Sequence, residues 1–118
     1  MMKKILKLTI IITFLILPVN ANTNYFDEGV RFFNKKEFNK AKFKFEQDIV
    51  FNPKNENTYL YLSKIYNFQK KNNLEEQNLD TVILLNPKNE EAIYNLAKLK
   101  LKNSDYQKSK KLVDQLIS

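Results

Sequence analysis

The sequence predicts an all-α protein, an α-solenoid of three helix-turn-helix units with about six helices. The first observation is a near-duplicate, because FNPKNE begins at Phe51 and LNPKNE begins at Leu85, a period of about 34 residues that is typical of helical repeats. The second is the spacing of apolar residues, which recur three and four positions apart, as on one face of a helix. The third is composition, because 118 residues with one Gly and three Pro lack the turn residues that sandwiches and barrels need.

The N-terminus has the layout of a secretory signal peptide, residues 1–21. A basic start, MMKKILK, precedes the apolar run LTIIITFLIL, which Pro18 closes, and the small residues of VNA then predict cleavage after Ala21. The alternative is an uncleaved inner-membrane anchor over residues 5–18, although this run is shorter than the roughly 20 residues of a spanning helix. We therefore expect an exported protein, periplasmic or secreted, with residues 22–118 as its domain.

The first unit, residues 22–55, contains two apolar faces separated by a short polar turn. Each face follows helical spacing, so the unit is expected to form a pair of helices. The positions that follow this spacing are Tyr25, Phe26, Gly29, Phe32 and Phe33 in the first helix and Phe38, Ala41, Phe45 and Ile49 in the second.

The second unit, residues 56–89, repeats this pattern around the polar stretch QKKNN. Asn72 and Glu75 stand where the first unit has an aromatic and a small residue, which leaves the start of the second helix open. Leu74 is a candidate to fill the aromatic's place. The apolar positions are Tyr59, Leu62, Ser63 and Tyr66 in the first helix and Leu79, Val82, Ile83 and Leu85 in the second.

The third unit, residues 90–118, stops short of a full period. Its turn is KNSD, and its columns match those of the other two units, which a chance pentapeptide would not bring with it. The apolar positions are Ile93, Leu96, Ala97 and Leu101 in the first helix and Leu112, Val113, Leu116 and Ile117 in the second.

The duplicated NPKNE is a signal that ends one helix and starts the next. Proline disfavours helix at the residue before it, so the second helices are expected to end at Asn52 and Asn86. Asn55 and Asn89 can then cap the following helices by accepting backbone N–H bonds. The glutamates that follow sit in a first helical turn, where the helix dipole favours negative charge.

Composition excludes several classes of chemistry. The chain has no Cys and no His, which removes the usual zinc sites, thiol nucleophiles, disulfides and the commonest general base. Adjacent carboxylates occur at Glu75 and Glu76 and again at Glu90 and Glu91, but neighbouring helical residues point about 100° apart and do not converge on one atom. We therefore predict no enzyme, no catalytic residue, no metal and no cofactor.

The charge of the chain is partly that of its leader. The 20 basic residues less the three of residues 1–21 leave 17 against 13 acidic residues, a net charge of +4 with the signs interspersed. The alternative function is binding of an anionic polymer, either nucleic acid or a polyanionic envelope component, through lysine-rich helix faces. Solvated helix faces are the favoured reading of these lysines, and nucleic acid is disfavoured. The lysines are Lys40, Lys42 and Lys44, and Lys108, Lys110 and Lys111.

Helix-turn-helix units with this period and these columns resemble the tetratricopeptide repeat (TPR) family, and the resemblance covers essentially all of residues 22–118. The family's small residue in the first helix falls on Gly29, Ser63 and Ala97, and its closing proline falls on Pro53 and Pro87. The other matched positions are Tyr25, Tyr59 and Ile93 for the first-helix aromatic, Phe38 and Tyr106 for the second-helix aromatic, and Ala41 and Ser109 for the second small residue.

The chain also departs from the family pattern. Glu28 and Asp48 replace apolar residues of the other units, and Lys100 stands where an aromatic is usual. Because the first unit is an end repeat, polar residues there are expected to face solvent. Some family members grip a C-terminal carboxylate with a Lys/Asn/Arg clamp, but of the matching positions here only Asn95 could donate, and Glu91 would repel.

The resemblance implies that the first helices line a concave groove that binds a protein or peptide. For Phe33 and Leu101, packing between helices is an equally open reading. The groove residues implied are Phe26, Val30, Phe33, Leu60, Tyr61, Lys64, Asn67, Tyr94, Asn95, Lys98 and Leu101.

A second interaction surface is expected at the C-terminus. The family commonly ends with an extra polar helix, whereas this sequence ends at Ser118. Leu112, Leu116 and Ile117 would then form an apolar edge for a partner or a second copy. The expected function is an exported scaffold in a bacterial envelope that mediates protein–protein contacts through the groove and this edge.

Overall fold

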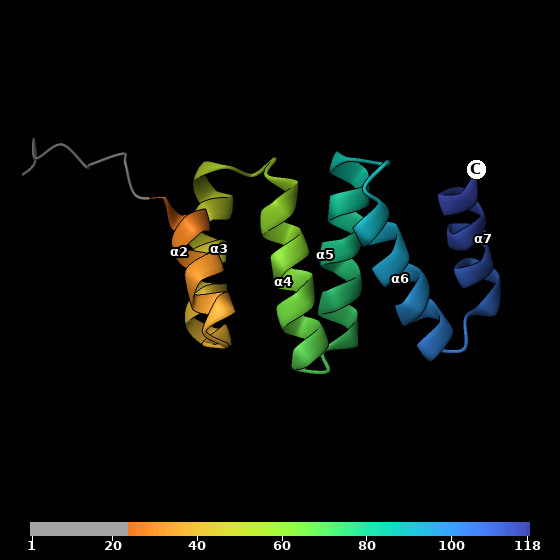
Figure 1. The fold of residues 1–118 in the computed structure, drawn as a ribbon, viewed down its shortest axis with the longest axis horizontal. Coiled ribbons are helices and arrows are strands. Elements are labelled where there is room, and N and C mark those ends of the chain that lie inside the picture. Colours follow the sequence, from red (N-terminus) through yellow and green to blue (C-terminus); the bar gives the residue numbers. More distant parts are fainter. Residues whose placement is uncertain (1–23) are drawn as a thin grey trace, which may run out of the picture.

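The computed structural model describes residues 24–118, which form six α-helices and no strand (Figure 1). The prediction of an all-α fold with repeated helix pairs is confirmed. None of the helices in this part of the chain is long and apolar enough to cross a bilayer. The predicted signal peptide, residues 1–21, lies outside the described residues. The helices are α2 (Tyr25–Asn34), α3 (Phe38–Phe51), α4 (Glu56–Phe68), α5 (Asn72–Leu85), α6 (Glu90–Lys102) and α7 (Tyr106–Ile117).

The helices stand side by side in the order of the chain (Figure 1). Each helix packs most extensively against its partner in the pair, α2 with α3, α4 with α5 and α6 with α7, and the pairs meet through α3 against α4 and α5 against α6. The main contacts are thus between neighbours in sequence, as in a solenoid. Such a stack buries its apolar surface only when the pairs lie next to each other.

The period also appears in the helix boundaries. The second helices begin at Phe38, Asn72 and Tyr106, which are separated by the same interval as the two copies of NPKNE. The open question about the second unit is therefore answered, because α5 begins in register at Asn72. Leu74 does not take the aromatic's place, since it is exposed on the outside of α5. That interpretation was wrong because the backbone turn keeps the register without an aromatic.

The caps between units form as predicted. Helices α3 and α5 end at Phe51 and Leu85, and Asn52 and Asn86 follow as C-caps. The side chain of Asn55 accepts the backbone N–H of Asn57 at 3.2 Å, and that of Asn89 accepts the N–H of Ala92 at 2.9 Å. The repeated Asn-Pro sequence therefore separates the units by satisfying helix ends locally.

The turns inside the pairs repeat a backbone conformation that the sequence does not announce. Lys36, Lys70 and Ser104 lie in the left-handed region, with φ of 60°, 56° and 62°. Each ends a first helix, and its N–H donates to a carbonyl three residues back, for example Lys36 to Phe33 at 2.9 Å. This is a helix C-terminal motif that usually carries glycine. Here no glycine marks it.

The core divides into an N-terminal cluster rich in aromatic rings and a C-terminal cluster of aliphatic side chains. Helix α4 takes part in both, because it packs against α3 on one side and α5 on the other. The buried members of the first cluster are Ala41, Phe45, Leu62, Ile65 and Tyr66. Those of the second are Leu60, Leu79, Val82, Ala92, Ile93, Leu96, Ala97, Leu99 and Leu112.

The only glycine in the chain lies where α2 crosses α3. A Cβ atom at Gly29 would lie 2.5 Å from Cε1 of Phe45, which is fully buried. The equivalent positions hold Ser63 and Leu79 in the second unit. The first unit thus combines the smallest residue with a large ring, and the ring fills the space that the missing side chain leaves.

The first interface between units contains a buried carboxylate. Asp48 is 2% exposed and accepts hydrogen bonds from the hydroxyl of Thr58 and from the amides of Asn52 and Asn55. The expectation that polar residues of the end unit face solvent is wrong here, because Asp48 points toward α4 and not toward the free end. In the next unit the equivalent positions are Val82 and Ala92, both fully buried.

Glu28 behaves differently from Asp48. It lies on α2, at the N-terminal end of the stack, and its carboxylate forms an ion pair with Lys44 at 2.7 Å. Both side chains keep partial contact with solvent. A polar residue is tolerated here because no further helix pair among residues 24–118 covers this side of α2.

We expect Gly29→Ala to destabilise the protein by about 1–3 kcal/mol through overpacking against Phe45. This would reverse the gain of about 1 kcal/mol that Gly→Ala usually brings inside a helix. In a Phe45→Leu background, which installs the residue of the second unit, the same change should cost less. Urea unfolding of the four proteins in this cycle measures the coupling, and additive effects would contradict the steric account.

We expect Thr58→Ala to lower the free energy of unfolding by about 1–3 kcal/mol, because the buried carboxylate of Asp48 loses a donor. The double variant Asp48→Val/Thr58→Ala installs the pair of the second interface and should be more stable than Thr58→Ala alone. Thermal and urea unfolding of both variants and the natural protein provide the comparison. If the double variant were the less stable of the two, the equivalence of the interfaces would be refuted.

Candidate functional site

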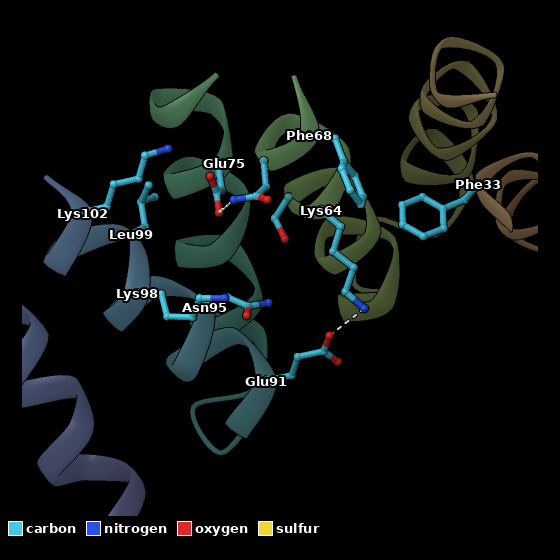
Figure 2. Close-up of a pocket in the computed structure, with 11 residues that line it drawn as sticks. Phe33, Lys64, Phe68, Glu75, Glu91, Asn95, Lys98, Leu99 and Lys102 are labelled. Carbon is cyan, nitrogen blue, oxygen red and sulfur yellow. Dashed lines mark hydrogen bonds and ion pairs between the residues drawn. The ribbon is translucent and has the colours of Figure 1, made fainter. Parts of the chain in front are cut away.

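A cavity of about 420 Å³ opens on the side formed by the first helices. Helices α2, α4 and α6 supply all of its lining residues except Glu75, which comes from α5. Figure 2 shows these side chains converging from the three units. The lining residues are Phe33, Ser63, Lys64, Asn67, Phe68, Glu75, Glu91, Asn95, Lys98, Leu99 and Lys102.

One end of the cavity is aromatic. The ring centroids of Phe33 and Phe68 lie 6.3 Å apart, and Phe68 also stacks on Phe38 at 4.8 Å. Phe68 is 61% exposed, so a large apolar ring faces solvent beside the cavity. An apolar side chain of a ligand could cover this ring and bury area that is now hydrated.

An ion pair lies along another side. The Nζ atom of Lys64 on α4 is 2.6 Å from the carboxylate of Glu91 on α6. The same ammonium lies over the ring of Tyr61, 5.1 Å from its centroid. Lys64 and Glu91 therefore neutralise each other across the space between two units, as the dashed line in Figure 2 indicates.

Glu75 forms the floor of the cavity. It occupies the column that holds Ala41 and Ser109 in the other units, and it is only 4% exposed. Its Oε1 atom accepts a hydrogen bond from the amide of Asn67 at 3.1 Å. Its Oε2 atom is buried and has no partner among the described residues. A carboxylate oxygen in this state lacks the compensation that buried polar groups normally have.

The electrostatics at Glu75 follow from this position. Burial raises the pKa of its carboxyl above the ordinary value, because water no longer stabilises the charged form. The hydrogen bond from Asn67 and the positive charges of Lys102 and Lys98 oppose the rise in pKa. Burial is the largest of these effects, so the folded protein holds this proton more tightly than the unfolded chain does.

Two lysines and an amide of α6 complete the polar lining. Lys98 and Lys102 are exposed, lie one helical turn apart and form no ion pair with a carboxylate of residues 24–118. Lys98 lies over the ring of Tyr94, 5.4 Å from its centroid. The half-buried amide of Asn95 lies beside Lys98 in Figure 2. These groups offer donors to a ligand in the cavity.

The structure brings together part of the groove set implied by the family. Phe33, Lys64, Asn67, Asn95 and Lys98 line the cavity. Phe33 also packs against the aromatic cluster, so packing between helices describes it, and its contact with a partner stays a prediction. The other predicted groove residues do not line the cavity. Phe26, Val30 and Tyr61 are partly buried in the aromatic cluster, and Leu60 is buried in the aliphatic cluster. Tyr94 and Leu101 are exposed.

Other lining residues were outside the predicted set. Glu75 was missed because only first helices were expected to face the groove. A signal was nevertheless present, since a glutamate in a column of small residues either distorts the helix pair or points its carboxyl elsewhere. Phe68 and Lys102 were missed because each lies in the last turn of its helix.

The C-terminal edge remains a prediction, and the structure locates its residues. Leu112 is buried in the aliphatic cluster, and Leu116 packs against it. Ile117 is 79% exposed, and Val113 is also exposed. The apolar surface of α7 that a partner could cover thus consists mainly of Val113 and Ile117.

The lysine-rich faces contain several internal ion pairs. Lys44 pairs with Glu28, Lys110 pairs with Asp114 at 2.9 Å, and Lys40 lies 3.8 Å from Glu37. Pairing with carboxylates of the chain leaves less positive charge available to a polyanion.

The adjacent carboxylates of α5 have separate environments. Glu75 faces the cavity, whereas Glu76 forms an ion pair with Lys100 of α6. The two groups therefore do not share a substrate position. Within residues 24–118, no group of three or more carboxylates is placed to hold a metal ion.

Comparisons with known proteins add no assignment. No family model matches the sequence, and no curated protein is significantly similar to it.

We expect Glu75→Gln to become increasingly stabilising, relative to the natural protein, as the pH rises above 4.5, the ordinary pKa of this group. Because the pKa of Glu75 is higher in the folded state than in the unfolded chain, the natural protein is most stable below the unfolded pKa, where Glu75 is protonated in both states. It loses stability as the pH rises through the folded-state pKa. Glutamine does not ionise, so the variant is spared this loss. Urea unfolding at a series of pH values measures the difference, with Glu90→Gln, an exposed glutamate, as the control. A difference that does not vary with pH would contradict the burial of an ionisable Glu75.

Proposed function

We propose that this chain is an exported, TPR-type scaffold that binds an extended segment of a partner protein in the cavity between its first helices. One observation carries the proposal. The cavity is built by side chains of all three helix pairs, although each pair is a separate unit of the repeat. A ligand that follows the row of first helices would contact several units at once, which is how stacked repeats bind extended chains.

The assignment to a TPR-type repeat is supported by the period and the small columns. Helix boundaries recur at the interval that separates Phe51 from Leu85, and Asn-Pro follows α3 and α5. The positions of Gly29, Ser63 and Ala97 are all buried where a first helix meets its partner. Close approach at these positions is what the family's small residue allows.

The chemistry of the lining supports a peptide as the ligand. The amide of Asn95 and the ammonium groups of Lys98 and Lys102 can bond to carbonyl or carboxylate oxygens, and Phe68 offers an exposed apolar surface. An extended peptide presents backbone donors and acceptors together with side chains of alternating direction, and it can satisfy such a mixed lining. The predicted leader supports a location of this interaction in the envelope or outside the cell.

Site-specific photo-crosslinking tests the proposal in the cells that naturally produce the full chain. We expect a benzophenone amino acid at Asn95, inside the cavity, to give discrete crosslinked products with a partner protein. The same amino acid at Gln107, exposed on α7, is the matched control and should give markedly less, because Gln107 lies outside the cavity lining. Mass spectrometry identifies the crosslinked segment. Discrete products at Gln107 with none at Asn95 would move the binding surface away from the first helices.

A further inference from the structure

We infer that the segment bound in this cavity is acidic, and that it gives a backbone N–H to the Oε2 atom of Glu75 while its carboxylates pair with Lys98 and Lys102. This inference rests on the proposed function, because it names the chemistry of the partner at the same site.

The first step is the unpartnered oxygen. Glu75 is nine-tenths or more buried and lines the cavity, yet only Oε1 has a donor, the amide of Asn67. Figure 2 shows the carboxylate between α4 and α6, with the hydrogen bond from Asn67 on one of its oxygens. Leaving the second oxygen without a donor costs free energy. Because Oε2 is buried, the carboxylate must turn toward the cavity to accept an N–H from a ligand, and the hydrogen bond formed in this way adds affinity.

The second step is the sign of the charge. Three lysines and two glutamates line the cavity, a net charge of +1 when Glu75 is ionised. Lys64 and Glu91 pair with each other. The uncommitted groups are therefore two ammonium groups and one buried carboxylate. A cationic side chain would meet this excess positive charge, whereas an acidic segment neutralises it.

The third step is the spacing. Lys98 and Lys102 are separated by four residues of α6, about 6 Å along a helix axis. In an extended peptide, side chains two residues apart point the same way and lie about 6.6 Å apart. Two acidic residues separated by one other residue can thus reach both ammonium groups, and the backbone between them carries the N–H toward Glu75.

Polyanions fit this arrangement less well. A phosphate chain or an oligonucleotide backbone offers charge to Lys98 and Lys102 but has no N–H in its backbone to donate to Oε2. An acidic peptide supplies both kinds of contact in one molecule. The Oε2 acceptor of Glu75 beside Lys98 and Lys102 therefore favours an acidic peptide over a phosphate-based polyanion.

The test uses acetyl-Gly-Glu-Phe-Glu-Gly-amide as the probe, titrated into the ¹⁵N-labelled protein and followed by NMR. We expect cavity resonances to shift, and the analogue with both Glu replaced by Gln to bind at least about tenfold more weakly. Lys98→Met/Lys102→Met should remove this discrimination. Lys108→Met/Lys111→Met, on α7 outside the cavity, is the matched charge control and should retain it.

The hydrogen bond to Glu75 has its own readout. N-methylation of each central residue of the probe in turn removes one N–H, and we expect one of these peptides to lose at least about tenfold in affinity. Glu75→Ala should abolish that difference. Alanine occupies the equivalent position in the first unit, at Ala41, so this variant is expected to keep the fold, and unfolding curves check it.

The possible results separate the two proposals. Equal binding of the Glu and Gln peptides, or no binding at millimolar concentration, overturns the inference, and crosslinking at Asn95 would then leave the proposed function standing. Tighter binding of oligothymidylate, strengthened by Glu75→Ala, overturns the inference in favour of a polyanion site. Absence of both crosslinks at Asn95 and shifts at the cavity removes both proposals.

Discussion

The structure depends on the close approach of two helices within each unit. At that crossing the first helix carries Gly29, Ser63 or Ala97, and all three positions are buried. A larger side chain would separate the helices, and the pair could then not present a continuous apolar side to its neighbour. Because each pair buries its surface only through the next one, a local steric requirement becomes a condition for the whole stack.

Much of this fold could be predicted because its signals are local. Asn-Pro ends a helix by excluding the helical conformation before proline, and the next asparagine caps the following helix within three residues. The left-handed turns at Lys36, Lys70 and Ser104 could not be predicted in this way, since that conformation costs a non-glycine residue about 1–2 kcal/mol and the sequence has lysine or serine there. The packing of the two helices imposes the turn.

The candidate site was less accessible to prediction for a related reason. The inner faces of first helices follow from the repeat, and they include Asn95 and Lys98. Glu75 follows from no periodic rule, because it is the exception in its column. Positions that break a repeat while remaining buried are where a repeat protein can acquire a function of its own, since the rest of the pattern already maintains the fold.

Two buried carboxylates show how such exceptions differ. Asp48 and Glu75 both replace small or apolar residues of the repeat, and both are almost fully buried. Asp48 receives three donors, from Thr58, Asn52 and Asn55, so its charge is fully used within the chain. Thr58 accompanies it, just as Ala92 accompanies Val82 in the next interface.

Glu75 has one companion, Asn67, which donates to Oε1 and stands where the other units have Phe33 and Leu101. The Oε2 atom of Glu75 lacks a donor among the described residues. Lys98 and Lys102 of α6 lower its pKa through their positive charge, but neither forms an ion pair with it. A carboxylate serving only the fold would be expected to have its donors built in, as Asp48 does, because a half-satisfied buried polar group is less stable than an apolar one. Glu75 therefore differs from Asp48 in keeping an acceptor oxygen that the described residues leave without a donor, at a position that lines the cavity.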